Sequence, residues 1–318
     1  NSSIIKKMKI LISDTLEDEG IDEFISNGFE VVKKFTITKE DLIEEIKDYD
    51  GIVVRSRTKL TADILENAKN LKVIGRAGVG LDNIDLKKAK EMNIEVFNTP
   101  EAPSVSVAEL TLGLMLAGAR KISHADRTMH QGQWNKNQYL GFTLKGKTLG
   151  LIGYGNVAKE LAKMAIGLGM TVGVYSRFSK GKVAIDEARA IGCIIYPTIE
   201  DLLKKSQFIS LHLPSTPQTE NILNESIMKL MRKDAFIINT ARGSLINEKA
   251  LLKALKSNQI AGAALDVFRE EPLRDKDLIE CAEDLILTPH IASQTIENQT
   301  EAALVVAKKM TTYLKKNI

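Results

Sequence analysis

The stretch that decides the expected fold is Lys147-Thr-Leu-Gly-Leu-Ile-Gly-Tyr-Gly-Asn-Val-Ala158. A short apolar strand leads into the turn Gly153-x-Gly155-x-x-Ala158. A helix is predicted from about residue 156 to residue 168, and a second strand over residues 171–175. Gly153 allows a tight turn, Gly155 allows the backbone to approach a pyrophosphate, and the small Ala158 allows the helix to pack closely against the strand.

A glycine triplet also occurs in ordinary tight turns, but here both flanking strands and the helix are in place. This context favours a dinucleotide site, because the positive end of the helix points at the phosphates. Asn156 and Val157 lie at the pyrophosphate turn.

The composition is that of a globular protein with 318 residues, enough for about two domains, of which 44% are hydrophobic. Its 44 Lys and Arg against 41 Asp and Glu leave a net charge of +3, with no basic stripe for nucleic acid and no membrane-binding face. The longest apolar stretch, residues 110–119, is too short to span a bilayer, and no signal-peptide core follows the lysines of residues 6–9. Cys193 and Cys281 lack metal-site spacing, which is typical of reduced thiols in a cytoplasmic protein.

Residues 1–98 alternate between strand and helix patterns. Strands are predicted at residues 8–13, 29–34, 51–54, 72–75 and 94–97, and helices within 14–27, 39–46, 61–68 and 85–92. This alternation predicts a parallel sheet with helices on both faces, and Thr38 is placed to cap the second helix. The loops at residues 55–59 and 76–80 follow strand ends, where ligands bind in such sheets.

The dinucleotide unit continues through predicted strands at residues 192–196, 208–212, 235–239, 262–265 and 285–287, before a final helix over residues 296–313. We therefore expect an α/β protein with two doubly wound parallel-sheet domains. A Rossmann nucleotide-binding domain over residues 99–290 is inserted into a flavodoxin-like substrate-binding domain of residues 1–98 and 291–318.

The helix expected over residues 104–120 is apolar on nearly every face. Such a helix is buried on all sides, either between domains or in a subunit interface. The polar stretch that follows, to about residue 144, holds the only tryptophan, Trp134.

Several longer motifs along the chain together carry a family resemblance. They are Val54-Arg-Ser-Arg-Thr-Lys59, Gly75-Arg-Ala-Gly-Val-Gly-Leu-Asp-Asn83, Ala108-Glu-Leu-Thr111, Gly150-Leu-Ile-Gly-Tyr-Gly155, Ile238-Asn-Thr-Ala-Arg-Gly243, Ala264-Leu-Asp-Val-Phe268, Glu271-Pro272 and Thr288-Pro-His-Ile-Ala292. With them the chain resembles the D-isomer-specific 2-hydroxyacid dehydrogenases over essentially its whole length, and within that family it is most similar to the 3-phosphoglycerate dehydrogenases. Two positions depart from the family pattern: Ala158 replaces the third glycine, a tolerated variant, and Ser176 stands where an acid is expected.

Hydride transfer between a 2-hydroxy acid and a nicotinamide requires a cation for the carboxylate, an acid/base for the hydroxyl proton, and a partner that tunes it. Arg242 follows an apolar strand, and a guanidinium can hold a carboxylate through two hydrogen bonds. His290 also follows a strand, and an ordinary histidine pKa of ~6.5 suits proton exchange. The resemblance assigns these roles to Arg242 and His290 and makes Glu271 the acidic partner. From the residues alone, a structural arginine and a satisfied histidine remain open.

The resemblance also implies contacts with the cofactor. Asp266 would receive the carboxamide nitrogen of the nicotinamide, although an aspartate here also suits a helix start or a loop. His212 would line the cofactor pocket. The remaining cofactor-binding residues that it implies are Val79, Leu213, Pro214, Thr240, Ala241 and Ala292.

For the substrate, the resemblance implies that the backbone N–H groups of Ala77, Gly78 and Val79 hold the carboxylate together with Arg242. Arg55 would contact a distal phosphate through a charge-assisted bond. Arg57 and Lys59 add positive charge to the same loop.

Trp134 and Lys136 match a segment that reaches the neighbouring subunit's site. A solvated lysine explains the charge of Lys136 equally well. With the apolar helix over residues 104–120, this segment predicts a homodimer.

Ser176 bears on the choice between NAD and NADP. In an NAD-specific site an acid after the second strand bonds the ribose hydroxyls and repels a 2′-phosphate. Here Ser176 and Arg177 follow that strand, with Lys180 and Lys182 close behind. A hydroxyl and a guanidinium suit a 2′-phosphate, so the sequence favours NADP. The alternative is an exposed basic loop in a protein that binds NAD through its other contacts.

We therefore expect an oxidoreductase that interconverts 3-phosphoglycerate and 3-phosphohydroxypyruvate, the first step from glycolysis toward L-serine. A glyoxylate or hydroxypyruvate reductase would use the same three residues, and the fold cannot separate these activities. A non-catalytic dinucleotide-sensing scaffold can share the architecture, but the complete set of Arg242, Glu271 and His290 favours an enzyme. No further βαβ-rich segment follows the last helix of the sequence, which predicts no inhibition by serine.

Overall fold

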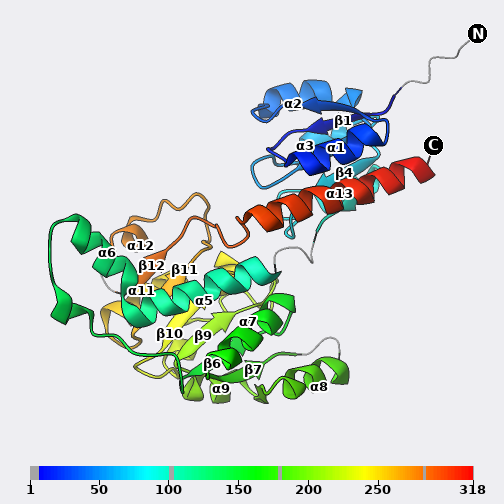
Figure 1. Ribbon diagram of the computed structural model, residues 1–318. Coiled ribbons are helices and arrows are strands. Elements are labelled where there is room, and N and C mark those ends of the chain that lie inside the picture. Colours follow the sequence, from blue (N-terminus) through cyan, green and yellow to red (C-terminus); the bar gives the residue numbers. More distant parts are fainter. Residues whose placement is uncertain (1–6, 100–103, 178–180, 282–283, 318) are drawn as a thin grey trace, which may run out of the picture. The chain divides into compact units, whose positions relative to one another are not determined.

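The structure is a computed structural model that describes residues 7–99, 104–177, 181–281 and 284–317 (Figure 1). The chain forms two compact units, one combining Asn1–Pro103 with Gln294–Ile318 and the other formed by Ser104–Ser293. The second unit is thus inserted into the sequence of the first. The domain limits expected from the sequence lie nearby, after residues 98 and 290.

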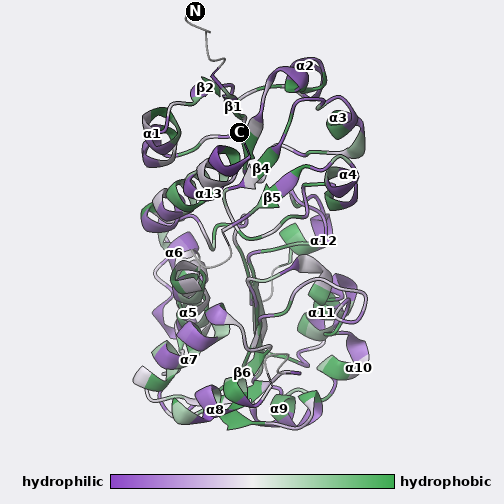
Figure 2. Ribbon diagram, turned by 90° about the vertical axis from the view of Figure 1, so that its right-hand side faces the viewer, coloured by the Kyte–Doolittle hydropathy of each residue, from purple (hydrophilic) through white to green (hydrophobic). Residues whose placement is uncertain are grey.

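The first unit contains a five-stranded parallel sheet. Its strands are β1 (Lys9–Ile12), β2 (Glu30–Lys33), β3 (Gly51–Val54), β4 (Val73–Arg76) and β5 (Glu95–Phe97), in the flavodoxin-like order β2-β1-β3-β4-β5. Apolar residues of α1 (Asp18–Ser26) and α13 (Ile296–Lys316) pack on one face, and those of α2 (Lys39–Glu45), α3 (Ala62–Glu66) and α4 (Leu86–Glu91) on the other (Figure 2).

Local sequence signals explain helix starts in this unit. The Thr38 hydroxyl accepts the Asp41 N–H at 3.1 Å at the start of α2, as predicted. Asp85 caps α4 in the same way by accepting the Lys88 N–H at 2.9 Å. These bonds satisfy N–H groups that lack partners within the helix.

The second unit contains a seven-stranded parallel sheet. Its strands are β6 (Thr148–Ile152), β7 (Thr171–Tyr175), β8 (Ile194–Ile195), β9 (Phe208–Leu211), β10 (Phe236–Asn239), β11 (Gly262–Leu265) and β12 (Leu285–Leu287), in the order β12-β11-β10-β9-β6-β7-β8. The order reverses between β6 and β9, and ligands bind at such a reversal in open α/β sheets.

Helices cover both faces of this sheet (Figure 2). One core contains apolar residues of α5 (Ser104–Arg120), α7 (Asn156–Gly167) and α8 (Lys182–Ala190), and the other contains those of α9 (Ile199–Lys205), α10 (Glu225–Met228), α11 (Glu248–Lys256) and α12 (Lys276–Ile279). The predicted fold class is confirmed: both units are doubly wound parallel sheets, and the inserted one has the Rossmann strand order.

Within its own unit the helix α5 is buried on one side, and burial of the other side between domains or in a subunit interface stays a prediction from its apolar sequence. One side, with Thr111 and Met115, packs into the core. Exposed residues recur every three or four positions on the other side, which the described elements of this unit leave uncovered: Val105, Glu109, Gly113, Leu116 and Arg120. The next helix, α6 (Ile122–His130), has no buried residue.

Among the described residues, no helix combines the length and the apolar character needed to cross a membrane.

Candidate active site

The predicted glycine turn lies where β6 ends and α7 begins. Gly153 has a φ of +97°, and a Cβ atom there would lie 2.2 Å from the His212 carbonyl oxygen. Its N–H donates to the Tyr175 carbonyl at 2.8 Å, which ties the turn to the end of β7. A residue with a side chain would be strained by the φ and excluded by the close approach.

Gly155 and the start of α7 leave room for a ligand. A Cβ atom built on Gly155, the N-cap residue of α7, would meet no heavy atom within 4 Å. The first N–H groups of the helix, at Asn156 and Val157, have no partner within the helix. Open space beside such a terminus fits a dinucleotide pyrophosphate. Ala158 is fully buried in the core, where its small side chain allows the helix to pack closely.

The other predicted cofactor residues of this unit also follow its strands. Ser176 and the exposed Arg177 follow β7, whereas Lys180 lies outside the described residues. The others are His212, Leu213 and Pro214 after β9, Thr240 and Ala241 after β10, Asp266 after β11, and Ala292 beyond β12. Because the strands are parallel, their carboxyl ends meet at one edge, where the strand order also reverses.

The surroundings of His212 favour the neutral form of its imidazole. Its Nε2 lies 2.8 Å from the Ser210 hydroxyl oxygen, and burial lowers the pKa of His212 to about 4. An uncharged ring suits the lining of a cofactor pocket better than proton exchange at neutral pH.

A braced turn after β10 presents Arg242. The Asn239 side chain donates to the Arg242 carbonyl at 2.9 Å and accepts the Ala241 N–H at 3.1 Å. The Arg242 guanidinium donates to the Ala241 carbonyl at 2.7 Å. Gly243 approaches the next loop so closely that a Cβ atom there would lie 2.0 Å from the Phe268 carbonyl carbon. The turn that presents Arg242 therefore packs backbone to backbone against the loop after β11.

His290 and Glu271 form the hydrogen-bonded pair expected from the sequence, with His290 Nδ1 2.7 Å from a Glu271 carboxylate oxygen. This bond raises the pKa of His290, against the lowering effects of burial and of the Arg242 charge. Burial by itself would raise the pKa of Glu271, but hydrogen bonds from His290 and from the Phe268 N–H hold it below its usual value. With Nδ1 occupied, Nε2 is the ring nitrogen available to exchange a proton.

Asp266 holds the turn that carries His290. Its fully buried carboxylate accepts the Thr288 hydroxyl at 2.6 Å and the N–H groups of Ile291 and Ala292 at 2.9 Å each. The bonded residues lie on both sides of His290 in the chain, and His290 itself has a φ of +54°. The resemblance assigns Asp266 to the cofactor and does not imply this positioning contact. The sequence could have predicted this contact, because an aspartate directly after an apolar strand is expected to be buried and then needs hydrogen-bond donors.

In the first unit, the predicted substrate residues lie in the loops after β3 and β4. Arg55 follows β3 and is partly buried. Arg57, expected to add charge to the same site, is engaged elsewhere: it pairs with Asp14 at 3.0 Å and donates to the Ile37 carbonyl at 3.2 Å. Lys59 is exposed.

The loop after β4 departs from the expectation at one residue. The Ala77 N–H already donates to the Val54 carbonyl at 3.0 Å, as part of the sheet, so it is not offered to a substrate carboxylate. Gly78 and Val79 lie beyond the strand. Gly78 has a φ of +145°, a conformation that favours glycine.

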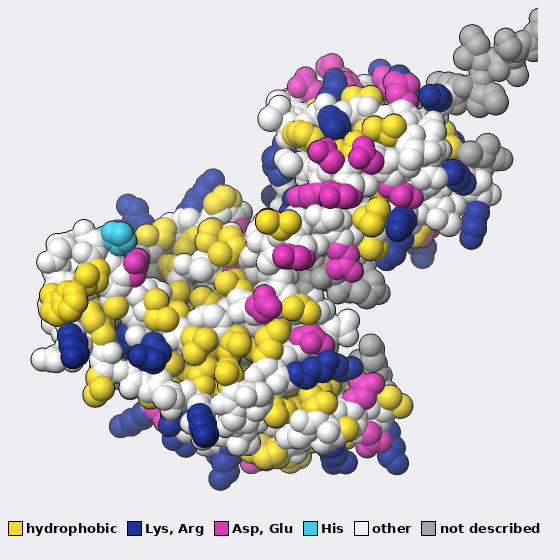
Figure 3. Space-filling view, in the orientation of Figure 1, with side chains coloured by type: hydrophobic (Ala, Val, Ile, Leu, Met, Phe, Trp, Pro, Cys, Tyr) yellow, Lys and Arg dark blue, Asp and Glu magenta, His cyan; other side chains and the backbone are white. Residues whose placement is uncertain are grey.

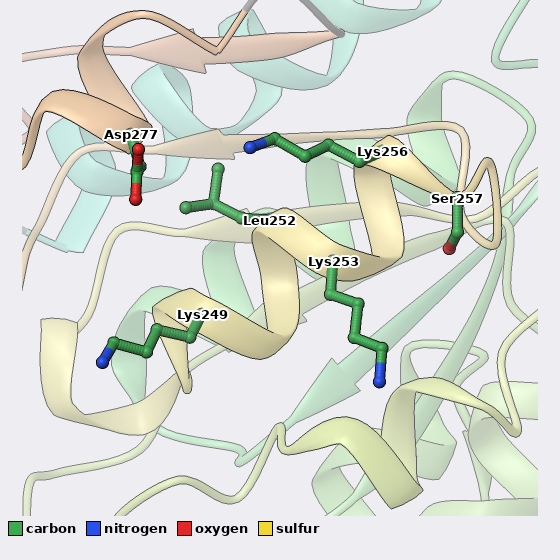
Figure 4. Close-up of a pocket in the computed structure, with 6 residues that line it drawn as sticks. All are labelled: Lys249, Leu252, Lys253, Lys256, Ser257 and Asp277. Atoms are coloured by element: carbon green, nitrogen blue, oxygen red, sulfur yellow. The ribbon is translucent and has the colours of Figure 1, made fainter.

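Two further features lie apart from these strand ends. Trp134 is 80% exposed, and Lys136 is exposed at the start of a short 3-10 helix, Lys136–Tyr139. A hollow on α11 is lined by Lys249, Leu252, Lys253, Lys256, Ser257 and Asp277 and contains none of the predicted site residues (Figure 4).

Residues 112–292 match the D-isomer specific 2-hydroxyacid dehydrogenase, NAD binding domain. The chain is 40% identical to the hydroxypyruvate reductase of Thermotoga maritima, over 96% of this chain and 97% of that protein. The chain belongs to the D-isomer-specific 2-hydroxyacid dehydrogenase family. The glycine turn from Gly153 to Ala158 lies within the matched NAD binding domain.

Two further similar proteins differ in the share of their own length that this chain matches. The D-3-phosphoglycerate dehydrogenase of Methanocaldococcus jannaschii is 45% identical over 95% of this chain but 57% of its own length, so the chain spans little more than half of that relative. The NADPH-dependent glyoxylate/hydroxypyruvate reductase of Sinorhizobium meliloti, solved in complex with NADP and malonate, has a TM-score of 0.80 and 25% identity, over 97% of this chain and 94% of that one.

Proposed function

We propose that this chain is a nicotinamide-dependent dehydrogenase that interconverts 3-phosphoglycerate and 3-phosphohydroxypyruvate, on the way to L-serine. The observation that supports this most directly is the 2.7 Å contact between His290 and Glu271, at the sheet edge that also presents Arg242. The cation Arg242 follows β10, the tuning partner Glu271 follows β11, and the acid/base His290 follows β12.

Each of the three side chains has a defined role in the oxidation. Arg242 binds the substrate carboxylate through its planar guanidinium. His290 accepts the C2 hydroxyl proton at Nε2, and the ionised Glu271 stabilises the resulting imidazolium through Nδ1–H. In the reduction the imidazolium returns that proton to the C2 oxygen. A bound nicotinamide cofactor supplies the acceptor or donor of the hydride at C2.

The cofactor would be held by the turn around Gly155 and the first N–H groups of α7. We infer a preference for NADP, because Ser176 follows β7 in place of a carboxylate and the exposed Arg177 stands beside it. The glyoxylate/hydroxypyruvate reductase of Sinorhizobium meliloti that was solved with NADP shares this fold.

Arg55 would bind the distal phosphate of the substrate, and the phosphoglycerate dehydrogenase name of the 45% identical relative agrees with that substrate. The second candidate is a reductase of hydroxypyruvate or glyoxylate. It is favoured by the names of the Thermotoga maritima and Sinorhizobium meliloti relatives.

We also propose a homodimer formed through the outer side of α5 and the segment around Trp134. Hydrophobic side chains gather on the face of the second unit over α5 (Figure 3). Large apolar side chains exposed on α5, α6 and the following segment are Val105, Leu116, Ile122, Met129, Trp134, Leu140 and Phe142. An exposed apolar patch of this kind marks an interaction site.

A steady-state comparison of 3-phosphohydroxypyruvate, hydroxypyruvate and glyoxylate tests the proposed activity. We expect the highest kcat/KM for the phosphorylated substrate. His290→Ala should bind dinucleotide and lose about 10²–10⁴-fold in kcat, as expected for a lost general acid/base. His130→Ala, which changes an exposed histidine of α6, is the control. A higher kcat/KM for glyoxylate would favour the reductase, and no turnover of any substrate would favour the non-catalytic scaffold.

A further inference from the structure

A buried carboxylate lies beneath the loop that carries Arg55. Asp14, whose side chain is 4% exposed, accepts the Arg55 N–H at 2.6 Å and the Thr58 N–H at 3.1 Å through one oxygen. Its other oxygen accepts the Thr58 hydroxyl at 2.6 Å and pairs with Arg57 Nε at 3.0 Å. Four donors from one short loop therefore converge on a single carboxylate.

The carbonyl groups of the same loop are held from another segment. Asn83 Nδ2 donates to the Arg55 carbonyl at 2.6 Å and to the Thr58 carbonyl at 2.7 Å. The Asn83 carbonyl accepts the Leu60 N–H at 2.8 Å, which fixes Asn83 to the chain just beyond the loop. Both the first and the last residue of the 55–58 loop are thus bonded at N–H and at C=O by Asp14 and Asn83, which we call the loop brace.

The guanidinium groups of the two arginines in this loop differ in how many hydrogen bonds they make to the protein. Arg57 is bound into the protein: besides Asp14, its guanidinium donates to the Ile37 carbonyl, to the Ser13 carbonyl and to the Thr58 hydroxyl. Among the described residues, the Arg55 guanidinium makes one hydrogen bond, to the Thr15 carbonyl at 3.4 Å, a long one. Arg55 is therefore the arginine of this loop that can exchange its bond for a ligand.

We propose that Asp14 and Asn83 are positioning residues that determine specificity for a phosphorylated substrate. They hold the backbone of the loop so that Arg55 is presented to the phosphate, and Asp14 keeps Arg57 in a structural role. The inference rests on the proposed function, because it assigns the phosphate of that substrate to Arg55. The resemblance assigns the phosphate to Arg55, but the sequence does not show the contacts that hold the loop and engage Arg57.

Asp14→Asn tests the proposal, because it keeps the shape of the side chain but removes its charge and places an NH₂ group among N–H donors. We expect KM for 3-phosphohydroxypyruvate to rise about tenfold, as for a displaced positioning contact. Both kcat and the KM for hydroxypyruvate should stay within about twofold of their wild-type values. Thr58→Val removes one donor with little change in volume and should raise the same KM by a smaller factor. It keeps the proposal testable if Asp14→Asn does not fold.

Asp50→Asn is the matched control. Asp50 precedes the same strand, β3, at its opposite end, accepts the Lys9 N–H at 2.9 Å and pairs with Lys72 at 3.1 Å. Its loss should lower stability without separating the two KM values. In the Arg55→Ala background, Asp14→Asn should add nothing to KM for the phosphorylated substrate, because the brace acts through Arg55.

The outcomes distinguish a failure of the proposed function from a failure of the loop brace. Wild-type protein without a preference for the phosphorylated substrate would overturn the proposed function and, with it, the phosphate role of the loop. A wild-type preference that survives both Asp14→Asn and Thr58→Val would overturn the loop brace and leave the proposed function standing. Equal increases in KM for both substrates, or the same change in Asp50→Asn, would also overturn it.

Discussion

At the scale of single residues, the chemistry proposed for this chain depends on the His290–Glu271 pair. The hydrogen bond that His290 donates to Glu271 raises the pKa of His290, whereas the nearby charge of Arg242 lowers it. The imidazolium is therefore favoured by one neighbour and opposed by the other. This balance keeps the ring able to exchange its proton in both directions of the reaction.

Glu271→Gln should move the pH dependence of the reaction toward acid. The reduction needs protonated His290, so its rate falls as the pH rises through the raised pKa of His290. Removing the Glu271 charge lowers that pKa, and the fall should begin at lower pH. The measurement is kcat/KM against pH for the reduction. Glu270→Gln, next to it and exposed, is the control, and a profile that is unchanged in Glu271→Gln would contradict the pairing.

Arg177→Ala should raise KM for NADPH more than KM for NADH. The proposed contact is a charge-assisted bond to the 2′-phosphate, worth about 1.5–3 kcal/mol when made, or roughly tenfold or more in KM. Arg189→Ala on α8 removes another exposed arginine and should change neither value. Strict use of NADH by the unmodified protein, with no effect of Arg177→Ala, would refute the inferred preference.

At the scale of elements, the turn after β10 and the loop after β11 depend on each other through the close approach at Gly243. The loop continues to Glu271, so this approach links the residue proposed to bind the carboxylate with the partner of the acid/base. Asp266 makes a similar link to the turn that carries His290. The candidate site is thus assembled by contacts between strand ends.

Gly243→Ala should destabilise the protein by about 1–3 kcal/mol, the usual cost of an overpacked site, and lower kcat as well. The added Cβ atom would lie 2.0 Å from the Phe268 carbonyl carbon and would displace the loop that leads to Glu271. The checks are thermal unfolding and kcat. At Gly167, a Cβ atom meets nothing within 4 Å, so Gly167→Ala should be neutral or stabilising. Equal stability of the two variants would show that the loops can separate freely.

In the molecule as a whole, the outer side of α5 is an apolar surface that the described elements of its own unit do not cover. Val105 and Leu116 are 50% and 39% exposed, on a helix whose sequence is apolar almost throughout. The proposed homodimer would cover this side and account for its composition.

Leu116→Glu should shift the protein from dimer to monomer, because burying an unpaired carboxylate in an apolar interface is unfavourable. Sedimentation velocity measures the change. Ile25→Glu, on α1 of the other unit, alters an exposed apolar side chain, 54% exposed, and should leave the oligomeric state unchanged. A wild-type monomer, or a Leu116→Glu dimer of undiminished affinity, would rule out this interface.

Features that depend on residues close together in the chain could be predicted before the fold was known. The turn from Gly153 to Ala158 follows from the positive φ and the small volumes that local geometry demands, and the cap at Thr38 follows from the N–H groups of one helix turn. Alternating strand and helix patterns likewise determined the class of fold. All of these depend on spacing along the chain.

Contacts between residues far apart in the chain could be identified only in the folded protein. Asp14 and Arg55 are 41 positions apart, and Asp266 lies 26 positions before Ala292. Their contacts exist because parallel strands bring separate loops to one sheet edge, in an order that residue periodicity does not encode. The same pairing engages the Ala77 N–H with Val54 and binds Arg57 into the fold. A hydrogen-bonding group has a limited number of partners, so only the folded neighbourhood decides whether it serves the fold or a ligand.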